Sequence, residues 1–199
     1  SSHVYKIQDL NLVFSGHGKH LDCPTLRLTN HHGLMIAGEA ALSNWDAGMD
    51  MYIYGKLGNL TMTKEGINVL MTNLTGKVPP ILQRLDYIRF NGEAAGYLHD
   101  LTLTGLFHTG AGMVKTDVMM SIDEQSMSRT YSGSVASADL DLGKLLNQEK
   151  KFGKVDFNVE LKGFNYKNRY PESYIKGIIS SFEYSQYQYE NIMLDGVYK

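Results

Sequence analysis

Histidines gather near the first predicted turn, and histidine is well suited to bind a metal ion or to transfer a proton. The residues of metal-ligand type there are His17, His20, Asp22, Cys23, His31 and His32. A structural zinc site needs four ligands at characteristic spacings, and a catalytic zinc site needs three ligands with an open position. No second cluster with such spacing follows, so we expect solvated turn histidines and no metal site.

Other catalytic motifs are equally weak. The chain has no GxSxG motif, and the serine-rich residues 132–137 are expected to form a loop. Residues 110–112 (GAG) lack the length and the ending of a phosphate-binding loop, so they predict a hairpin turn. An enzyme would need His17, His20 and Asp22, or the pair Asp139 and Asp141, to converge in a pocket. We expect no catalytic residues and no cofactor.

Composition and charge favour a β protein that does not bind nucleic acid. The 199 residues are 43% hydrophobic, which is enough for a core, and 20 glycines against four prolines suit strands joined by tight turns. Lysine plus arginine (19) nearly balance aspartate plus glutamate (21), and the longest basic run is Lys150–Lys151. Such a chain has no basic stripe that would release counterions from a phosphate backbone.

The chain carries no recognisable targeting or anchoring segment. The single cysteine, Cys23, cannot form an internal disulfide, and no run approaches the roughly 18 apolar residues of a membrane-spanning helix. The start, SSHVYK, lacks the features of a secretory signal. We therefore expect the chain to be a piece of a longer protein.

Hydrophobic periodicity predicts an antiparallel meander interrupted by two short helices. Thr63 is a candidate N-cap for a helix with Ile67, Leu70, Met71 and Leu74 on one face, and Asp141 is a candidate cap for a second helix. Strands are expected over residues 4–14, 25–30, 34–42, 49–58, 85–96, 99–109, 113–122, 155–163, 174–181, 182–189 and 192–199.

One strand poses the main functional question. In residues 155–163 (VDFNVELKG), four apolar side chains alternate with four polar ones. Exposing the apolar four to water would forfeit roughly 1.5 to 3 kcal/mol each, so something must cover them. The candidates are a second sheet, a helix or a bound apolar ligand.

A strand, helix and amphipathic strand recur in both halves of the chain. This recurrence predicts two degenerate units, at about residues 1–82 and 83–199.

Residues 140–146 (LDLGKLL), 153–163 (GKVDFNVELKG) and 184–198 (YSQYQYENIMLDGVY) resemble the TamB branch of the AsmA-like envelope proteins of diderm bacteria. The resemblance extends from about Gly58 to the end. It implies a mainly β fold, in which a curved and largely antiparallel sheet forms an open groove (β-taco-like) with one or two short helices. It also implies a periplasmic protein, anchored in the inner membrane by its parent chain, that supports outer-membrane assembly and lipid transport between membranes.

The resemblance further implies a binding role without catalysis. Phospholipid acyl chains would lie in the groove, and an outer-membrane barrel partner would be engaged by parts of the parent that this chain does not contain. The residues expected to line the groove are Val155, Phe157, Val159, Leu161, Leu101, Leu103, Ile88 and Phe90.

A second hypothesis remains open. The chain would then be a secreted β-sandwich module whose tyrosines between residues 184 and 189 recognise a carbohydrate or a protein partner.

Overall fold

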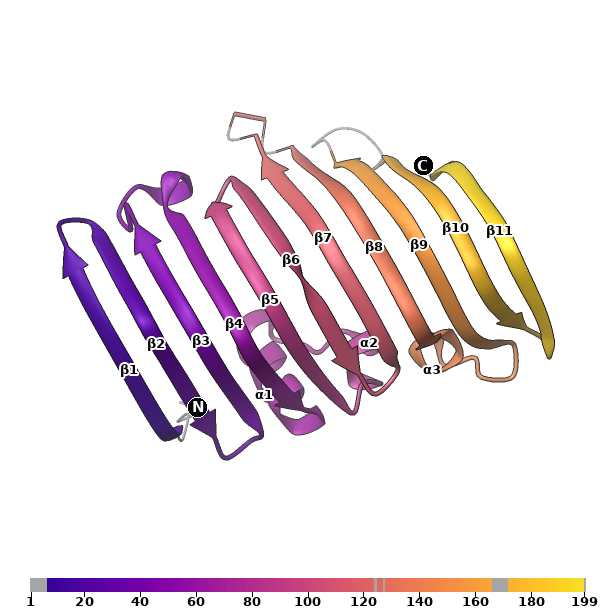
Figure 1. The fold of residues 1–199 in the computed structure, drawn as a ribbon, viewed down its shortest axis with the longest axis horizontal. Coiled ribbons are helices and arrows are strands. Elements are labelled where there is room, and N and C mark those ends of the chain that lie inside the picture. Colours follow the sequence, from indigo (N-terminus) through magenta and orange to yellow (C-terminus); the bar gives the residue numbers. More distant parts are fainter. Residues whose placement is uncertain (1–6, 124, 127, 166–171, 199) are drawn as a thin grey trace.

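The computed structural model describes residues 7–123, 125–126, 128–165 and 172–198, and all of their strands belong to one sheet. The eleven strands lie side by side in sequence order, and each is antiparallel to its neighbours (Figure 1). The strands are β1 (Ile7–His17), β2 (His20–Asn30), β3 (Leu34–Ser43), β4 (Tyr52–Thr63), β5 (Tyr87–Tyr97), β6 (Asp100–Thr109), β7 (Gly112–Ile122), β8 (Arg129–Asp141), β9 (Phe152–Asn165), β10 (Glu172–Tyr184) and β11 (Tyr187–Tyr198).

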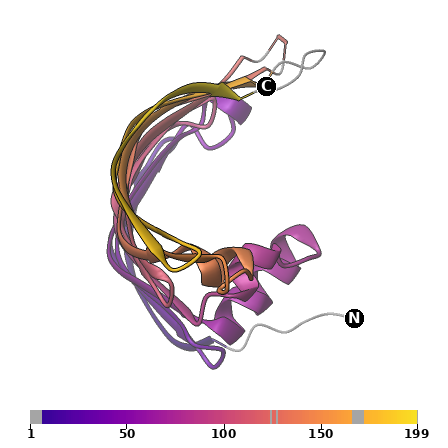
Figure 2. The ribbon, with the colours of Figure 1, turned by 90° about the vertical axis from the view of Figure 1, so that its right-hand side faces the viewer.

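The sheet is strongly curved and does not close. Seen along the sheet from the β11 side, the strands follow the outline of a letter C, with the helices on its inner side at one end (Figure 2). The prediction of a mainly β fold with a curved antiparallel sheet forming an open groove is confirmed. The sandwich hypothesis required two packed sheets, whereas the described strands form a single one.

Within the described residues three α-helices interrupt the meander, one more than the sequence predicts. They are α1 (Lys64–Thr75), α2 (Pro80–Gln83) and α3 (Leu142–Leu146), with a single 3₁₀ turn at Gly48–Asp50. Both predicted caps are confirmed. The Thr63 hydroxyl accepts a hydrogen bond from the Gly66 amide at 3.3 Å, and the Asp141 carboxylate accepts one from the Lys144 amide at 2.8 Å.

Two strand predictions were wrong, each because a local polar cluster imitates a turn. Residues 132–137, expected to be a loop, lie inside β8. Residues 174–189 were expected to form two strands divided after Ser181, but β10 continues to Tyr184 and β11 begins at Tyr187. The β9–β10 register shifts between Ile179 and Ser181, so a bulge continues the strand where a break was predicted.

Curvature comes from such bulges and from glycines within strands. Register shifts occur in six of the ten strand pairs, including β3–β4, β4–β5 and β8–β9. Gly133 in β8 and Gly177 in β10 have φ angles of 144° and 155°. A Cβ on Gly133 would lie 2.6 Å from the Val118 Cα, so neighbouring strands approach here closer than a side chain allows.

The buried core lies where the helices cover the inner side of the sheet. Ile67 of α1 is 1% exposed and packs with strand residues and with Leu145 of α3. The members of this cluster are Ile67, Leu85, Ile88, Ala111, Leu140, Leu145 and Val155. The rest of the inner face has no helix or second sheet over it among the described residues.

The two predicted units do not correspond to separate sheets. The boundary at residue 82 falls within α2, and β4 pairs with β5 across it. The helices nevertheless recur at the same ends of the strands, after β4 and after β8 (Figure 1). The degenerate repeat remains a prediction.

Candidate functional site

The inner face of the sheet is apolar from one edge to the other. Antiparallel partners share a face, so the register follows each inner-face residue from strand to strand. One row crosses all eleven strands and is interrupted by a single polar residue, Ser137. This central apolar row contains Leu10, Leu28, Ile36, Leu60, Phe90, Phe107, Val114, Ser137, Phe157, Ile179 and Ile192. We call this concave face the apolar trough.

The convex face carries most of the polar strand residues, as their alternation requires, and it also exposes Met119, Met193 and Val197. One polar row crosses nine strands without an apolar member. It contains Glu39, Lys56, Glu93, Thr104, Asp117, Ser134, Glu160, Lys176 and Asp195. The inner surface of the sheet is therefore more apolar than the outer one.

All eight residues predicted to line the groove lie on the trough face, although only half of them are accessible. Ile88 and Val155 are buried in the core beneath the helices, and Phe90 and Val159 are 7% and 4% exposed. Protein already covers these four side chains, so they offer little surface to a ligand. The other four are partly exposed: Leu101, Leu103, Phe157 and Leu161.

Aromatic rings lie flat on glycines within the trough. The Phe90 ring covers Gly105 so closely that a Cβ there would overlap it, and it packs against Phe107 with ring centroids 4.6 Å apart. The Tyr131 ring covers Gly163 in the same way, and its hydroxyl lies 2.6 Å from the Ser173 hydroxyl. These pairs bury apolar area while keeping the floor of the trough smooth.

One rim of the trough is a helical lip, formed by α1, α2, the segment 84–86 and α3. The Arg84 guanidinium donates a hydrogen bond to the Leu145 carbonyl of α3. The Lys144 ammonium lies 2.6 Å from the Asp86 carboxylate and 2.9 Å from the Gly110 carbonyl oxygen. Lys144, chiefly through this hydrogen bond, holds the pKa of Asp86 below its ordinary value.

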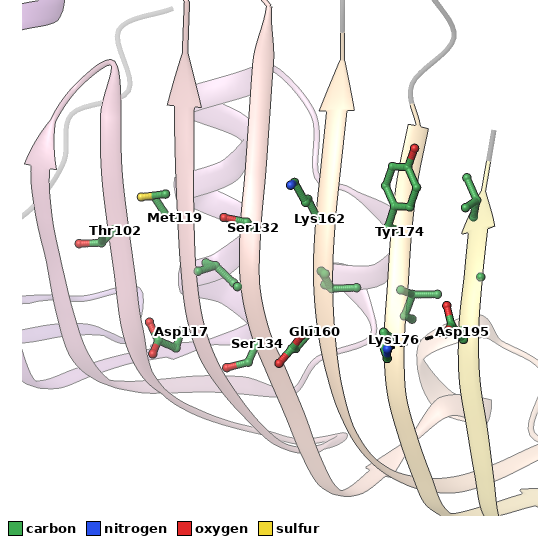
Figure 3. Close-up of a pocket in the computed structure, with 16 residues that line it drawn as sticks. Thr102, Asp117, Met119, Ser132, Ser134, Glu160, Lys162, Tyr174, Lys176 and Asp195 are labelled. Atoms are coloured by element: carbon green, nitrogen blue, oxygen red, sulfur yellow. Dashed lines mark ion pairs between the residues drawn. The ribbon is translucent and has the colours of Figure 1, made fainter.

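The convex face carries a shallow depression with a volume of about 680 Å³, over strands β6 to β11. Figure 3 shows Asp117, Ser134 and Glu160 in one row and Ser132 and Lys162 in the next. These side chains point away from the trough, because their strand neighbours, such as Leu161, face it.

Four of the five residues weighed as catalytic candidates, His20, Asp22, Asp139 and Asp141, have structural partners. His20 Nδ1 lies 2.6 Å from the Ser43 hydroxyl, and His20 Nε2 lies 2.9 Å from the Asp22 carboxylate. All three side chains lie on the convex face. The His20 and Asp22 side chains are 47% and 52% exposed, so water competes for this bond. Asp139 forms an ion pair with Lys154 at 3.0 Å, and Asp141 caps α3.

Within the described ranges, no group of three or more His, Cys, Asp or Glu side chains is arranged to hold a metal ion. No described helix is both long and apolar enough to cross a bilayer.

Sequence reasoning missed the first four strands as part of the trough. Leu10 and Leu12 of β1 are 46% and 42% exposed on this face, and Leu28 and Ile36 continue the central apolar row. Their period-two alternation is visible in the sequence. What the sequence lacks is the register, which decides whether alternating strands share one face.

Comparison of the chain with protein-family models, with curated proteins and with solved structures finds no match.

Proposed function

We propose that the apolar trough binds the acyl chains of phospholipids and that the protein acts without chemistry. In this proposal the chain is a segment of a TamB-like, AsmA-type periplasmic protein whose parent is anchored in the inner membrane. Its role is to support outer-membrane assembly and the transport of lipid between membranes. A barrel partner in the outer membrane would be engaged by other parts of the parent.

The observation that supports the proposal is the central apolar row, which crosses every strand on the concave face. Monomeric soluble proteins rarely expose continuous apolar patches larger than a few hundred Å², and larger patches usually mark binding sites. The buried cluster beneath the helical lip packs against Phe107, Val114, Phe157 and Ile179 of this row, whereas the row members on β1, β2 and β3 lie outside that cluster. Leu10, Leu12 and Met120 are 46%, 42% and 42% exposed on the same face.

An acyl chain is the apolar ligand that fits a long, smooth and open surface. Ten strand spacings of about 4.8 Å give a trough about 48 Å long, which exceeds the roughly 30 Å hydrocarbon thickness of a bilayer. Affinity would come from buried apolar area at about 25 cal/mol per Å². Because this attraction has no direction, we expect weak discrimination among phospholipid headgroups.

Site-specific photo-cross-linking tests the proposal directly. A benzophenone amino acid is placed at Leu103, which faces the trough, or at the adjacent Thr104, which faces outward from the same strand. After incubation with phospholipid vesicles and irradiation, we expect lipid adducts at position 103 and not at position 104. Equal labelling at both positions, or labelling at 104 alone, would contradict the proposal.

Native mass spectrometry supplies the second measurement. Leu103→Asp with Leu161→Asp places two carboxylates in the trough at partly exposed positions. We expect co-purified phospholipid to disappear from this variant and to remain in the Thr104→Asp control. Circular dichroism must show an intact sheet in both proteins. A wild-type protein that carries no lipid, even after exposure to vesicles, would reject acyl-chain binding.

A further inference from the structure

We propose that the depression on the convex face binds a linear, uncharged oligosaccharide that lies across strands β7 to β11. This site occupies the surface opposite the apolar trough, so it does not depend on acyl-chain binding. Its volume of about 680 Å³ lies within the range of small-molecule sites, about 300–1,000 Å³.

Each of strands β7 to β11 presents two side chains to the depression; both are polar on β8 and β9, whereas Met119 of β7 and Val197 of β11 are apolar (Figure 3). β8 presents Ser132 and Ser134, and β9 presents Lys162 and Glu160. Two such residues lie about 6.7 Å apart along a strand, and the next pair follows about 4.8 Å away on the neighbouring strand. A chain of sugar rings carries hydroxyl groups on both sides at a similar repeat. Each ring would therefore meet one pair.

The central pair is available to a ligand. The Glu160 side chain is exposed and has no hydrogen bond or ion pair with any described residue. The Lys162 ammonium lies 5.6 Å from the centre of the Phe164 ring and forms no salt bridge within the described part of the chain. The carboxylate accepts a hydrogen bond from one sugar hydroxyl, and the neighbouring ammonium group donates one to the next, which is the pairing that a polyol requires.

Tyr174 adds an apolar surface to this polar groove. Its side chain stands on the β10 strand beside Lys162, at the rim of the depression (Figure 3). The residue is 40% exposed, and its hydroxyl donates to the Glu172 carboxylate at 3.2 Å. A tyrosine whose polar end is already held offers its ring to the apolar face of a sugar.

Charge and shape disfavour the other ligand classes. The depression carries three carboxylates and two ammonium groups, a net charge of −1, which repels nucleic acid and acidic polysaccharides. The polar row from Asp117 to Asp195 would have to lose its water to an acyl chain without compensation. An extended peptide pairs with the edge of a sheet rather than with its face.

Titration followed by NMR tests the inference. The wild-type protein is titrated with cellohexaose, chitohexaose and maltohexaose, three uncharged linear hexasaccharides. We expect at least one of them to shift backbone amide signals of β8, β9 and β10. Glu160→Ala and Tyr174→Ala should each weaken that binding by about 2- to 10-fold, the effect of losing one hydrogen bond or one stacked ring.

Two controls separate this site from the trough. Glu93→Ala removes the same charge from the same polar row, outside the depression, and should leave binding unchanged. Leu103→Asp, which disrupts the apolar trough, should also leave it unchanged. Failure of all three hexasaccharides to bind, or equal binding by the Glu160→Ala, Tyr174→Ala and wild-type proteins, would overturn the inference whether or not the trough binds lipid.

Discussion

At the residue scale, glycines control how sharply the sheet bends. Gly133 has a φ angle of 144°, and a Cβ added to it would overlap the Asp117 carbonyl oxygen of the neighbouring strand. Gly55, by contrast, has no atom within 4 Å of the position that a Cβ would occupy. Both lie on the trough face, so the two positions differ in their geometry and not in the side of the sheet to which they belong.

Gly133→Ala should therefore destabilise the protein by about 1–3 kcal/mol, because a side chain is forced into a strained conformation against a neighbouring backbone. Gly55→Ala is the matched control and should change the free energy of unfolding by less than about 0.5 kcal/mol. Urea denaturation followed by circular dichroism measures both. An equal effect of the two substitutions would show that the close approach at Gly133 does not govern the bend.

At the scale of elements, the helical lip is held to the sheet edge by few polar contacts. The Lys144 ammonium bridges the Asp86 carboxylate and the Gly110 carbonyl oxygen, and Arg84 binds the end of α3. The Asp86 side chain is 60% exposed, so the pair is screened by solvent, and its effect should be local to the lip.

Acid should loosen this lip. The folded-state pKa of Asp86 is lowered, chiefly by its hydrogen bond to Lys144. The stability that the ionised Asp86 carboxylate contributes is therefore complete above its unfolded-state pKa of about 3.9. It is lost as the pH falls through the lower folded-state pKa. We expect Asp86→Asn to speed amide exchange in α3 at pH 7. At a pH below both values, that difference from the wild-type protein should vanish.

Asp46→Asn is the control for this prediction. Lys19 lowers the pKa of Asp46 in the same way, chiefly through a side-chain hydrogen bond. That pair joins two loops at the ends of the strands opposite the helical lip. The substitution should leave exchange in α3 unchanged at every pH. Equal acceleration of α3 by both substitutions would mean that the effect is global and not confined to the lip.

Sequence reasoning worked at this scale wherever a local rule decides the outcome. Thr63 and Asp141 marked the starts of two helices, and period-two alternation marked most strands. It failed at Ser181, where a bulge carries the strand through, and at residues 132–137, because serine and glycine suit a curved strand as well as a loop. Bulges depend on the partner strand, which a single sequence does not reveal.

At the scale of the whole molecule, the trough is a single surface shared by all eleven strands. The predicted lining residues were placed on the correct face because alternation fixes the face within one strand. Which of them remain accessible depends on where α1 and α3 fold back, and that is a tertiary contact. Ile88 and Val155 are lost to the core for this reason.

A bulky side chain on the trough floor should obstruct the bound lipid. Gly55→Trp projects into the open space above β4, whereas Lys56→Trp places the same ring on the convex face. We expect the first variant to hold fewer phospholipids per chain in native mass spectrometry and the second to match the wild-type protein. An unchanged lipid load in Gly55→Trp would exclude the floor of β3–β5 from the ligand path.

The strand order has a consequence for how the chain acquires its shape. Every strand pairs only with those before and after it in the sequence, so no strand pairing waits for two distant segments to meet, although the contacts between α1 and α3 in the lip do. A growing edge can accept one hairpin after another, as solenoids add repeats. The sheet should therefore form progressively, by addition of successive strands to the part that folds first. Removing one internal pair of strands would shorten the sheet without altering its curvature.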